Sequence, residues 1–132
     1  ATVGSVATSE QLISAGKTIR QMPTAETISR YAVRLVLATH PEHEYAPACV
    51  RRYVRAGASP RAAQSLLAVA KFFAVLDGRL NASADDVRRA ADPCLRHRIL
   101  LNFDAIADDA TTDTLIRQLL MDLDAPKNPK RK

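Results

Sequence analysis

The sequence predicts an all-α fold, a helical bundle of four to five main helices that forms a single domain. Apolar residues recur three and four positions apart along most of the chain, and strict alternation of apolar and polar residues is nearly absent. A chain of 132 residues that is 47% hydrophobic can also bury one core of its own. The pattern allows one exception, a short extended segment between Leu100 and Phe103.

The bundle is expected to occupy residues 8–124. We expect residues 1–7 to form a flexible N-terminal segment and residues 125–132 to form a basic disordered tail. The closing sequence "PKNPKRK" carries four positive charges, so the net charge of +5 falls to +1 without it. The basic composition is therefore a weak argument for a nucleic-acid-binding surface.

The first two helices are recognised by their spacing and by a proline. Helical spacing runs from Ser9 to Gln21, and Pro23 ends that helix. Residues 24–40 predict an amphipathic second helix. Its apolar face consists of Ile28, Ala32, Leu35, Val36 and Thr39. Between His40 and Ala58 the pattern breaks up around Pro41, Pro47 and Gly57, which predicts a long loop with at most a short turn at residues 49–54.

The third helix has the clearest start signal in the chain. Ser59 is expected to be its N-cap and Pro60 its first helical residue, where the missing amide hydrogen costs nothing. The helix should end near Asp77 and Gly78. Its predicted buried stripe consists of Ala63, Leu66, Leu67, Ala70, Phe73 and Ala74.

The remaining helices follow from a capping pair and from apolar spacing. Ser83 and Asp86 have the spacing of a capping box at the start of a fourth helix, which Pro93 is expected to end or kink. Residues 94–103 should then form a short helix that runs into an extended stretch. A last helix begins at Thr112 and carries Leu115, Ile116, Leu119, Leu120 and Leu123.

Cysteine usage and hydropathy predict a soluble, cytoplasmic protein. Cys49 and Cys94 lie far apart and no leader sequence precedes them, so we expect both to be reduced thiols. No apolar run approaches the roughly 18 residues that cross a bilayer, so no membrane partner is expected.

Two groups of residues resemble a phosphate loop and a zinc site, but neither has the spacing that such a site requires. The tripeptide "GKT" at residues 16–18 would need a glycine at position 11 to form a phosphate loop, but position 11 is Gln11. His40, His43 and Cys49 lack a second ligand pair at zinc-site spacing, as do Cys94 and His97, so no metal site is expected. Nucleophilic catalysis by either cysteine is not predicted from the sequence.

Arg61 is the most informative residue. A cation in the first turn of a helix is opposed by the helix dipole, by a few tenths to about 1 kcal/mol. With Ser59 capping the same turn, bare amides and a guanidinium would converge on the space beyond the helix, which suits a phosphate. The alternative is that Arg61 merely extends into water.

Arg96 and Arg98 should lie on different sides of a helix, so at least one faces inward or toward a partner unless it pairs with a nearby aspartate.

Four motifs together resemble a known family. They are "GASPRA" (57–62), "LDGR" (76–79), "SADDV" (83–87) and "LRHRILLNF" (95–103). Over about residues 8–123, the sequence resembles the C-terminal lid of MoxR-type AAA+ ATPases, which are related to the magnesium-chelatase ATPase subunit. The resemblance implies that Arg61 is a sensor-2 arginine, beside Ser59 and Pro60, and that it reaches the γ-phosphate of ATP. Arg96 and Arg98 become candidate interface residues.

The same resemblance implies partners and a cofactor. ATP with Mg²⁺ would be bound in the full-length protein by a core domain that carries the phosphate loop, and these residues show no such loop. The chain alone is therefore expected to bind no cofactor and to hydrolyse no ATP. Family members form hexameric rings and act as chaperone-like remodellers, often with a von Willebrand factor A protein.

Two other functions stay open at this point. The first is a basic helical module that binds nucleic acid through residues 50–55, Arg88, Arg89 and the tail, and such binding would fall steeply with salt. The other is a free-standing protein-interaction bundle. The near-neutral charge of residues 1–126 makes nucleic acid the less favoured partner.

Overall fold

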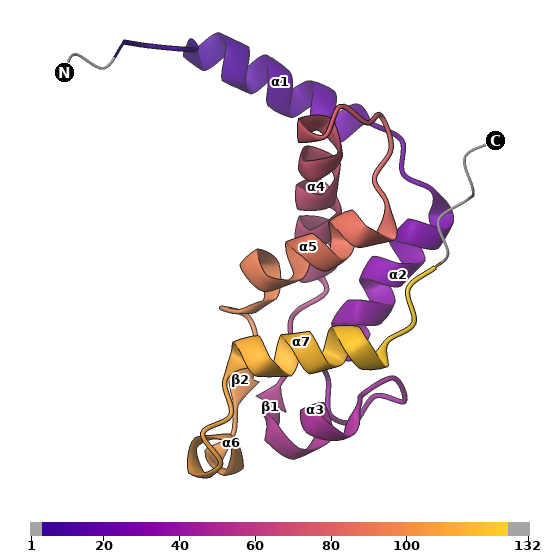
Figure 1. Ribbon diagram of the computed structural model, residues 1–132, viewed down its shortest axis with the longest axis vertical. Coiled ribbons are helices and arrows are strands. Elements are labelled where there is room, and N and C mark those ends of the chain that lie inside the picture. The colour runs from indigo at the N-terminus through magenta and orange to yellow at the C-terminus, as the bar shows by residue number, and fades with distance from the viewer. Residues whose placement is uncertain (1–3, 127–132) are drawn as a thin grey trace.

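A computed structural model describes residues 4–126 of the chain. The all-α prediction is confirmed, with a two-stranded sheet as the only non-helical element among these residues (Figure 1). The elements are α1 (Ser9–Gln21), α2 (Glu26–Leu37), α3 (Ala48–Tyr53), β1 (Val54–Ala56), α4 (Arg61–Leu76), α5 (Ala84–Leu95), β2 (Leu100–Leu101), α6 (Phe103–Ala107) and α7 (Thr112–Asp122).

The core lies among α2, α4, α5 and α7. Helix α4 packs against α5 and α2, and α7 packs against α5 and α3. Alanine is the commonest residue of the buried cluster, and larger side chains lie between the alanines, so the helices can approach closely. The fully buried large residues include Tyr31, Leu35, Leu66, Leu95, Ile116 and Leu119. The predicted faces of α2, α4 and α7 are therefore confirmed, although Leu67, Phe73 and Leu120 are only partly buried.

Helix α1 stands apart from this core. It has the predicted bounds and begins with a capping box between Thr8 and Gln11, but none of its residues is buried. Leu12 is 66% exposed and Ile13 is 56% exposed. Its main contact is with α4, where Lys71 Nζ donates a hydrogen bond to the Arg20 carbonyl oxygen at 3.2 Å. Figure 1 accordingly shows α1 extending from the end of the molecule opposite to α6.

The prediction of a long loop from His40 to Ala58 was only partly right. The loop after α2 ends at Pro47, and the short turn expected at residues 49–54 is helix α3, where Val50 is fully buried and which runs directly into β1. Strand β1 pairs antiparallel with β2, with Val54 opposite Leu101. The prediction of an extended segment near Leu100 is thereby confirmed, although the sequence did not reveal the strand that pairs with it.

Pro93 does not end α5, and no new helix begins after it before β2, so the predicted short helix at this point was wrong. Helix α5 continues through Pro93 to Leu95, and the chain then turns into β2. Pro93 lies in the last turn, where its missing amide hydrogen removes a single helical hydrogen bond. The following helix, α6, was not predicted. Its cap is Asn102, whose Oδ1 accepts from the Ala105 amide at 3.1 Å.

The starts of α5 and α7 agree with the sequence. The Ser83 and Asp86 capping box is present, and α7 begins at Thr112 after the N-cap Thr111. The ends of the chain are only partly described. Residues 4–8 contain neither helix nor strand. Residues 1–3 of the expected flexible segment and 127–132 of the expected disordered tail lie outside the described residues.

Candidate functional site

Arg61 is the first residue of α4 and its side chain is exposed. Among residues 4–126 the guanidinium has no ion pair and no hydrogen bond. The first turn of α4 contains no acidic residue, so no nearby carboxylate of that turn offsets the positive charge at the positive end of the helix dipole. The charge of Arg61 is thus available to a group outside the described chain.

The helix start differs from the prediction in one respect. Pro60 has helical dihedrals (φ −54°, ψ −27°), as expected for a first helical position, although α4 is assigned from Arg61. No side-chain hydrogen bond caps α4, so the prediction that Ser59 is a side-chain N-cap was wrong. The Ser59 side chain is exposed, and its backbone carbonyl accepts from the Ala62 amide at 2.8 Å. The amides of the first turn are therefore not occupied by a capping side chain.

The segment that leads into Arg61 is held by the end of α2. Thr39 Oγ1 accepts a hydrogen bond from the Ala58 amide at 2.9 Å, and His40 Nε2 donates to the Ala58 carbonyl oxygen at 2.9 Å. Both Thr39 and Ala58 are fully buried. A Cβ on Gly57 would lie 2.7 Å from the Thr39 carbonyl oxygen, so only glycine fits this close approach. We name Thr39, His40, Gly57 and Ala58 the Thr39 clamp.

The Thr39 clamp was not predicted from the sequence. His40 stands out in the sequence only as a possible zinc ligand, and no short-range pattern links it to Ala58 across the intervening residues. The glycine was the available signal, because a glycine beside a helix start often marks a close backbone approach.

Arg96 and Arg98 have different surroundings. Arg96 ends α5 and its Nε forms an exposed ion pair with Asp113 on α7, which is the simple surface pair considered for it. Arg98 is half-buried, and its Nη1 donates to Ser65 Oγ on α4 at 2.9 Å. The structure therefore brings Arg98, but not Arg96, to the helix that begins with Arg61.

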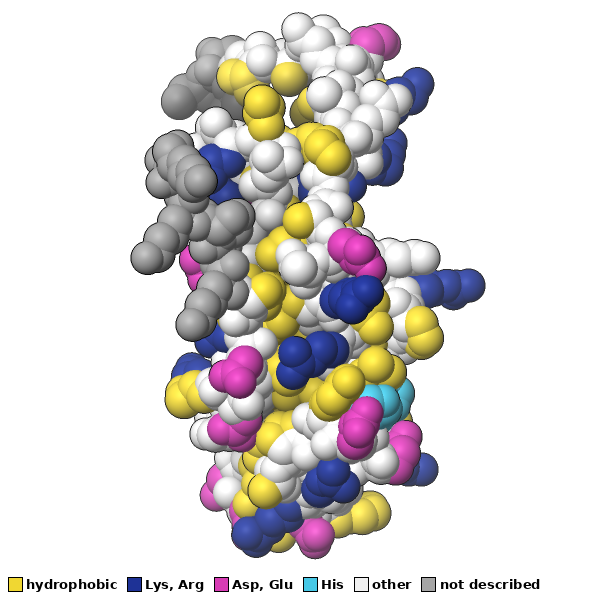
Figure 2. Space-filling model, turned by 90° about the vertical axis from the view of Figure 1, so that its right-hand side faces the viewer, with side chains coloured by type: hydrophobic (Ala, Val, Ile, Leu, Met, Phe, Trp, Pro, Cys, Tyr) yellow, Lys and Arg dark blue, Asp and Glu magenta, His cyan; other side chains and the backbone are white. Residues whose placement is uncertain are grey.

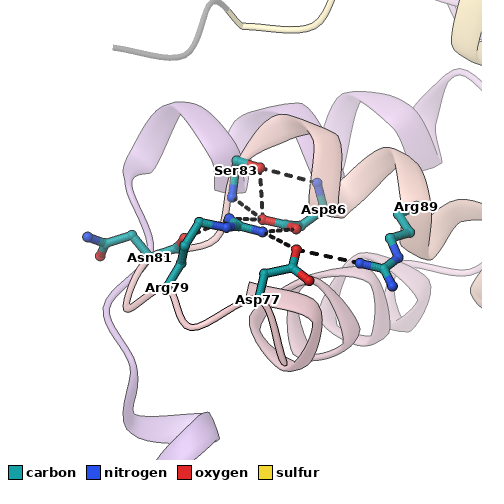
Figure 3. Close-up of polar contacts among 6 residues, drawn as sticks. All are labelled: Asp77, Arg79, Asn81, Ser83, Asp86 and Arg89. Atoms are coloured by element: carbon teal, nitrogen blue, oxygen red, sulfur yellow. Dashed lines mark hydrogen bonds and ion pairs between the residues drawn. The ribbon is translucent and has the colours of Figure 1, made fainter. Parts of the chain in front are cut away.

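Two of the sequence motifs form a structural network rather than a binding site (Figure 3). Asp86 Oδ1 and Oδ2 each accept a hydrogen bond from the Arg79 guanidinium at 2.7 Å, and Oδ2 also accepts from the Ser83 amide at 2.8 Å. Asp77 accepts from Arg79 and lies 3.6 Å from Arg89 Nη1. Burial alone would raise the pKa of Asp86, but the hydrogen bonds from Arg79 and Ser83 outweigh it and hold that pKa below its ordinary value. The network fixes the turn between α4 and α5.

The remaining candidates do not assemble a site. Residues 16–18 lie within α1, and Thr18 Oγ1 donates to the Ser14 carbonyl oxygen, so "GKT" is part of a helix surface. Both cysteines are free, and burial raises the pKa of each thiol. No group of three or more metal-ligating side chains occurs within residues 4–126. No helix in the same range is long and apolar enough to span a membrane.

On one face of the molecule, the surface charges are mixed rather than segregated. Figure 2 shows basic and acidic side chains interspersed over one face, with hydrophobic side chains between them. Several arginines are paired with carboxylates, including Arg30 with Glu26 and Arg52 with Asp108. This face shows no single-sign patch of the kind that nucleic-acid phosphates would require.

Comparison with protein families identifies the class. The model of the AAA lid domain family matches residues 47–119, which include α3 through most of α7. The chain belongs to the AAA lid domain family.

Two longer proteins are similar to this chain, and both similarities agree with a lid of a MoxR-type AAA+ ATPase. The chain is 31% identical over 124 residues to Chaperone MoxR1 of Mycobacterium tuberculosis, an alignment that covers 89% of this chain and 33% of that protein. It also resembles the crystal structure of an inferred ATPase from Cytophaga hutchinsonii, with a TM-score of 0.82 and 30% identity over 89% of this chain and 36% of the other. The chain thus spans about a third of the length of each.

Proposed function

We propose that this lid contributes Arg61 as the sensor-2 arginine of a MoxR-type ATPase, where it contacts the γ-phosphate of ATP held by a core domain. The observation that carries the proposal is the exposed Arg61 guanidinium, which has no counter-charge within residues 4–126. A planar guanidinium at a helix start suits a phosphate, because it can donate two parallel hydrogen bonds.

The lid lacks the residues that phosphoryl transfer requires, so that reaction is assigned to the core domain. Phosphoryl transfer needs residues that cradle the β- and γ-phosphates, hold Mg²⁺ and orient the attacking water. The "GKT" tripeptide cannot supply them, since it lies on the surface of α1. ATP and Mg²⁺ are therefore assigned to the core domain, and the lid alone should not hydrolyse ATP.

The wider assignments rest on the family. We propose that residues 8–124 form the lid unit, that the ATPase assembles as a hexameric ring, and that it remodels other proteins in a chaperone-like manner, with a von Willebrand factor A protein as a partner. A cytoplasmic location fits the two free cysteines. The face in Figure 2 does not favour the nucleic-acid-binding alternative, because charges of both signs are interspersed on it.

The test is ATP turnover by the ATPase that carries this lid. Arg61→Ala should lower kcat by about 100-fold, the order expected when one donor to the developing charge is removed. The thermal unfolding midpoint should not fall, because the Arg61 side chain forms no hydrogen bond or ion pair within residues 4–126 and its charge opposes the helix dipole. Arg30→Ala is the matched control, since Arg30 is also exposed and pairs only with Glu26 on its own helix. Equal turnover in the two variants would exclude Arg61 from the reaction.

A further inference from the structure

We propose that Arg98 is a second polyphosphate-binding arginine and that it acts beside Arg61 on the same triphosphate. This inference rests on the proposed function and deepens it, because it adds a ligand contact from the turn between α5 and β2. It also separates the two arginines of "LRHR", of which only Arg98 reaches α4.

The first step is geometric. Ser65 lies four residues after Arg61, so the two occupy the same side of α4 one turn apart. Ser65 Oγ donates to the Arg61 carbonyl oxygen at 3.3 Å and accepts from Arg98 Nη1 at 2.9 Å. Side chains on a helix lean toward its N-terminus, so the Ser65 hydroxyl and the guanidinium bound to it lie over the turn that Arg61 begins.

The second step concerns charge. The hydrogen-bond acceptors of Arg98 are Ser65 Oγ and, at 3.2 Å from its Nε, His97 Nε2. The nearby Cys94 is buried and stays a thiol. No carboxylate in the described part of the chain forms an ion pair with Arg98 or with Arg61.

The third step is the donor count. A guanidinium has five N–H groups, and Arg98 uses one on Nε and one on Nη1. Both N–H groups of Nη2 remain without an acceptor among the described residues. Because Arg98 is half-buried and already fixed at two atoms, it loses little freedom when it binds a ligand.

These features together suit a ligand with several negative charges. Two guanidinium groups near one helix start repel each other, and a single phosphate would engage only one of them fully. A triphosphate offers neighbouring anionic groups that can each accept a forked contact. We assign Arg61 to the γ-phosphate and Arg98 to the adjoining phosphate, where it would hold ground state and transition state alike.

The experiment measures nucleotide affinity in the ATPase that carries this lid, with ATPγS as the probe. Arg98→Gln should raise the Kd for ATPγS about tenfold, as expected when a charge-assisted contact is lost. Arg96→Gln is the matched control from the same motif, since Arg96 pairs with Asp113 at the surface, and it should bind ATPγS as the unmodified protein does. Arg98→Lys should restore part of the affinity, because it keeps the charge but loses the fork.

A second variant separates binding from a structural role. Ser65→Ala removes the link between Arg98 and α4 but keeps both charges, so its Kd should rise less than that of Arg98→Gln. If Ser65→Ala reproduces the full loss of affinity, or if Arg98→Gln and Arg96→Gln bind ATPγS equally, the inference is overturned. Should Arg61→Ala leave turnover unchanged, the proposed function itself fails. Reduced turnover in Arg61→Ala beside equal affinity of Arg98→Gln and Arg96→Gln would remove the Arg98 assignment alone.

Discussion

Thr39→Val should loosen the segment that carries Arg61. Thr39 Oγ1 accepts from the Ala58 amide at 2.9 Å and donates to the Val36 carbonyl oxygen at 2.6 Å, and both Thr39 and Ala58 are fully buried. Valine has the same shape but no acceptor, so the Ala58 amide would stay buried and unpaired. Such a loss costs about 1–3 kcal/mol. We expect about 2 kcal/mol in the free energy of unfolding, a large share of the roughly 5–15 kcal/mol of a typical domain.

Urea unfolding and amide hydrogen exchange measure this effect on the 132-residue chain. The midpoint should fall with an unchanged slope, and the Ala58 amide should exchange faster than the amides of α7. Thr27→Val is the control, because Thr27 is exposed on α2, the helix that ends just before Thr39. If the two variants have the same unfolding free energy within about 0.5 kcal/mol and Ala58 exchanges as before, the Thr39 clamp does not hold this segment.

Two further changes test the packing around the site. Gly57→Ala should destabilise the fold by about 1–3 kcal/mol, because the added Cβ would lie 2.7 Å from the Thr39 carbonyl oxygen. Gly16→Ala on α1 is the control, because its Cβ would meet only a side-chain atom, at 3.9 Å. In thermal unfolding this control should be neutral or stabilising. Asp86→Asn should cost about 3 kcal/mol at pH 7, because it breaks the paired contact with Arg79. Since folding lowers the pKa of Asp86, the stability that its carboxylate contributes is present above pH ~4 and is lost as the pH falls further. The difference in unfolding free energy between variant and parent should therefore shrink in acid. A difference that is independent of pH would refute the role of the Asp86 charge.

The main helices were predictable because each one carries its own local signals. The capping pair of Ser83 and Asp86 lies within one turn, and the buried faces of α2 and α7 follow the helical period. Such signals need no knowledge of the rest of the chain. They fix where a helix begins and which side it buries.

The short elements were not predictable in the same way. Strand β1 has three residues and β2 has two, and each is ordered by the other across a long stretch of sequence. Helix α6 is only five residues long, too short for a periodic pattern. The prediction that Pro93 ends its helix failed because a proline destabilises a helix least near its C-terminal end, and α5 ends two residues after Pro93.

The candidate site also combines one feature that the sequence reveals with contacts that only the fold reveals. The cation at the start of α4 was visible in the sequence, since it opposes the helix dipole without an acidic neighbour in that turn. Its surroundings were not visible. The contact of Ser65 with Arg98 and that of Thr39 with Ala58 both join residues from different elements, so only the folded structure brings them together.

The most direct test of the account is a structure of the ATPase that carries this lid, determined with a non-hydrolysable ATP analogue bound. We predict that a terminal nitrogen of Arg61 lies about 3 Å from a γ-phosphate oxygen, the distance of a charge-assisted hydrogen bond. An Arg61 side chain that points into solvent, or that pairs with a carboxylate of the core domain while other groups hold the γ-phosphate, would contradict it.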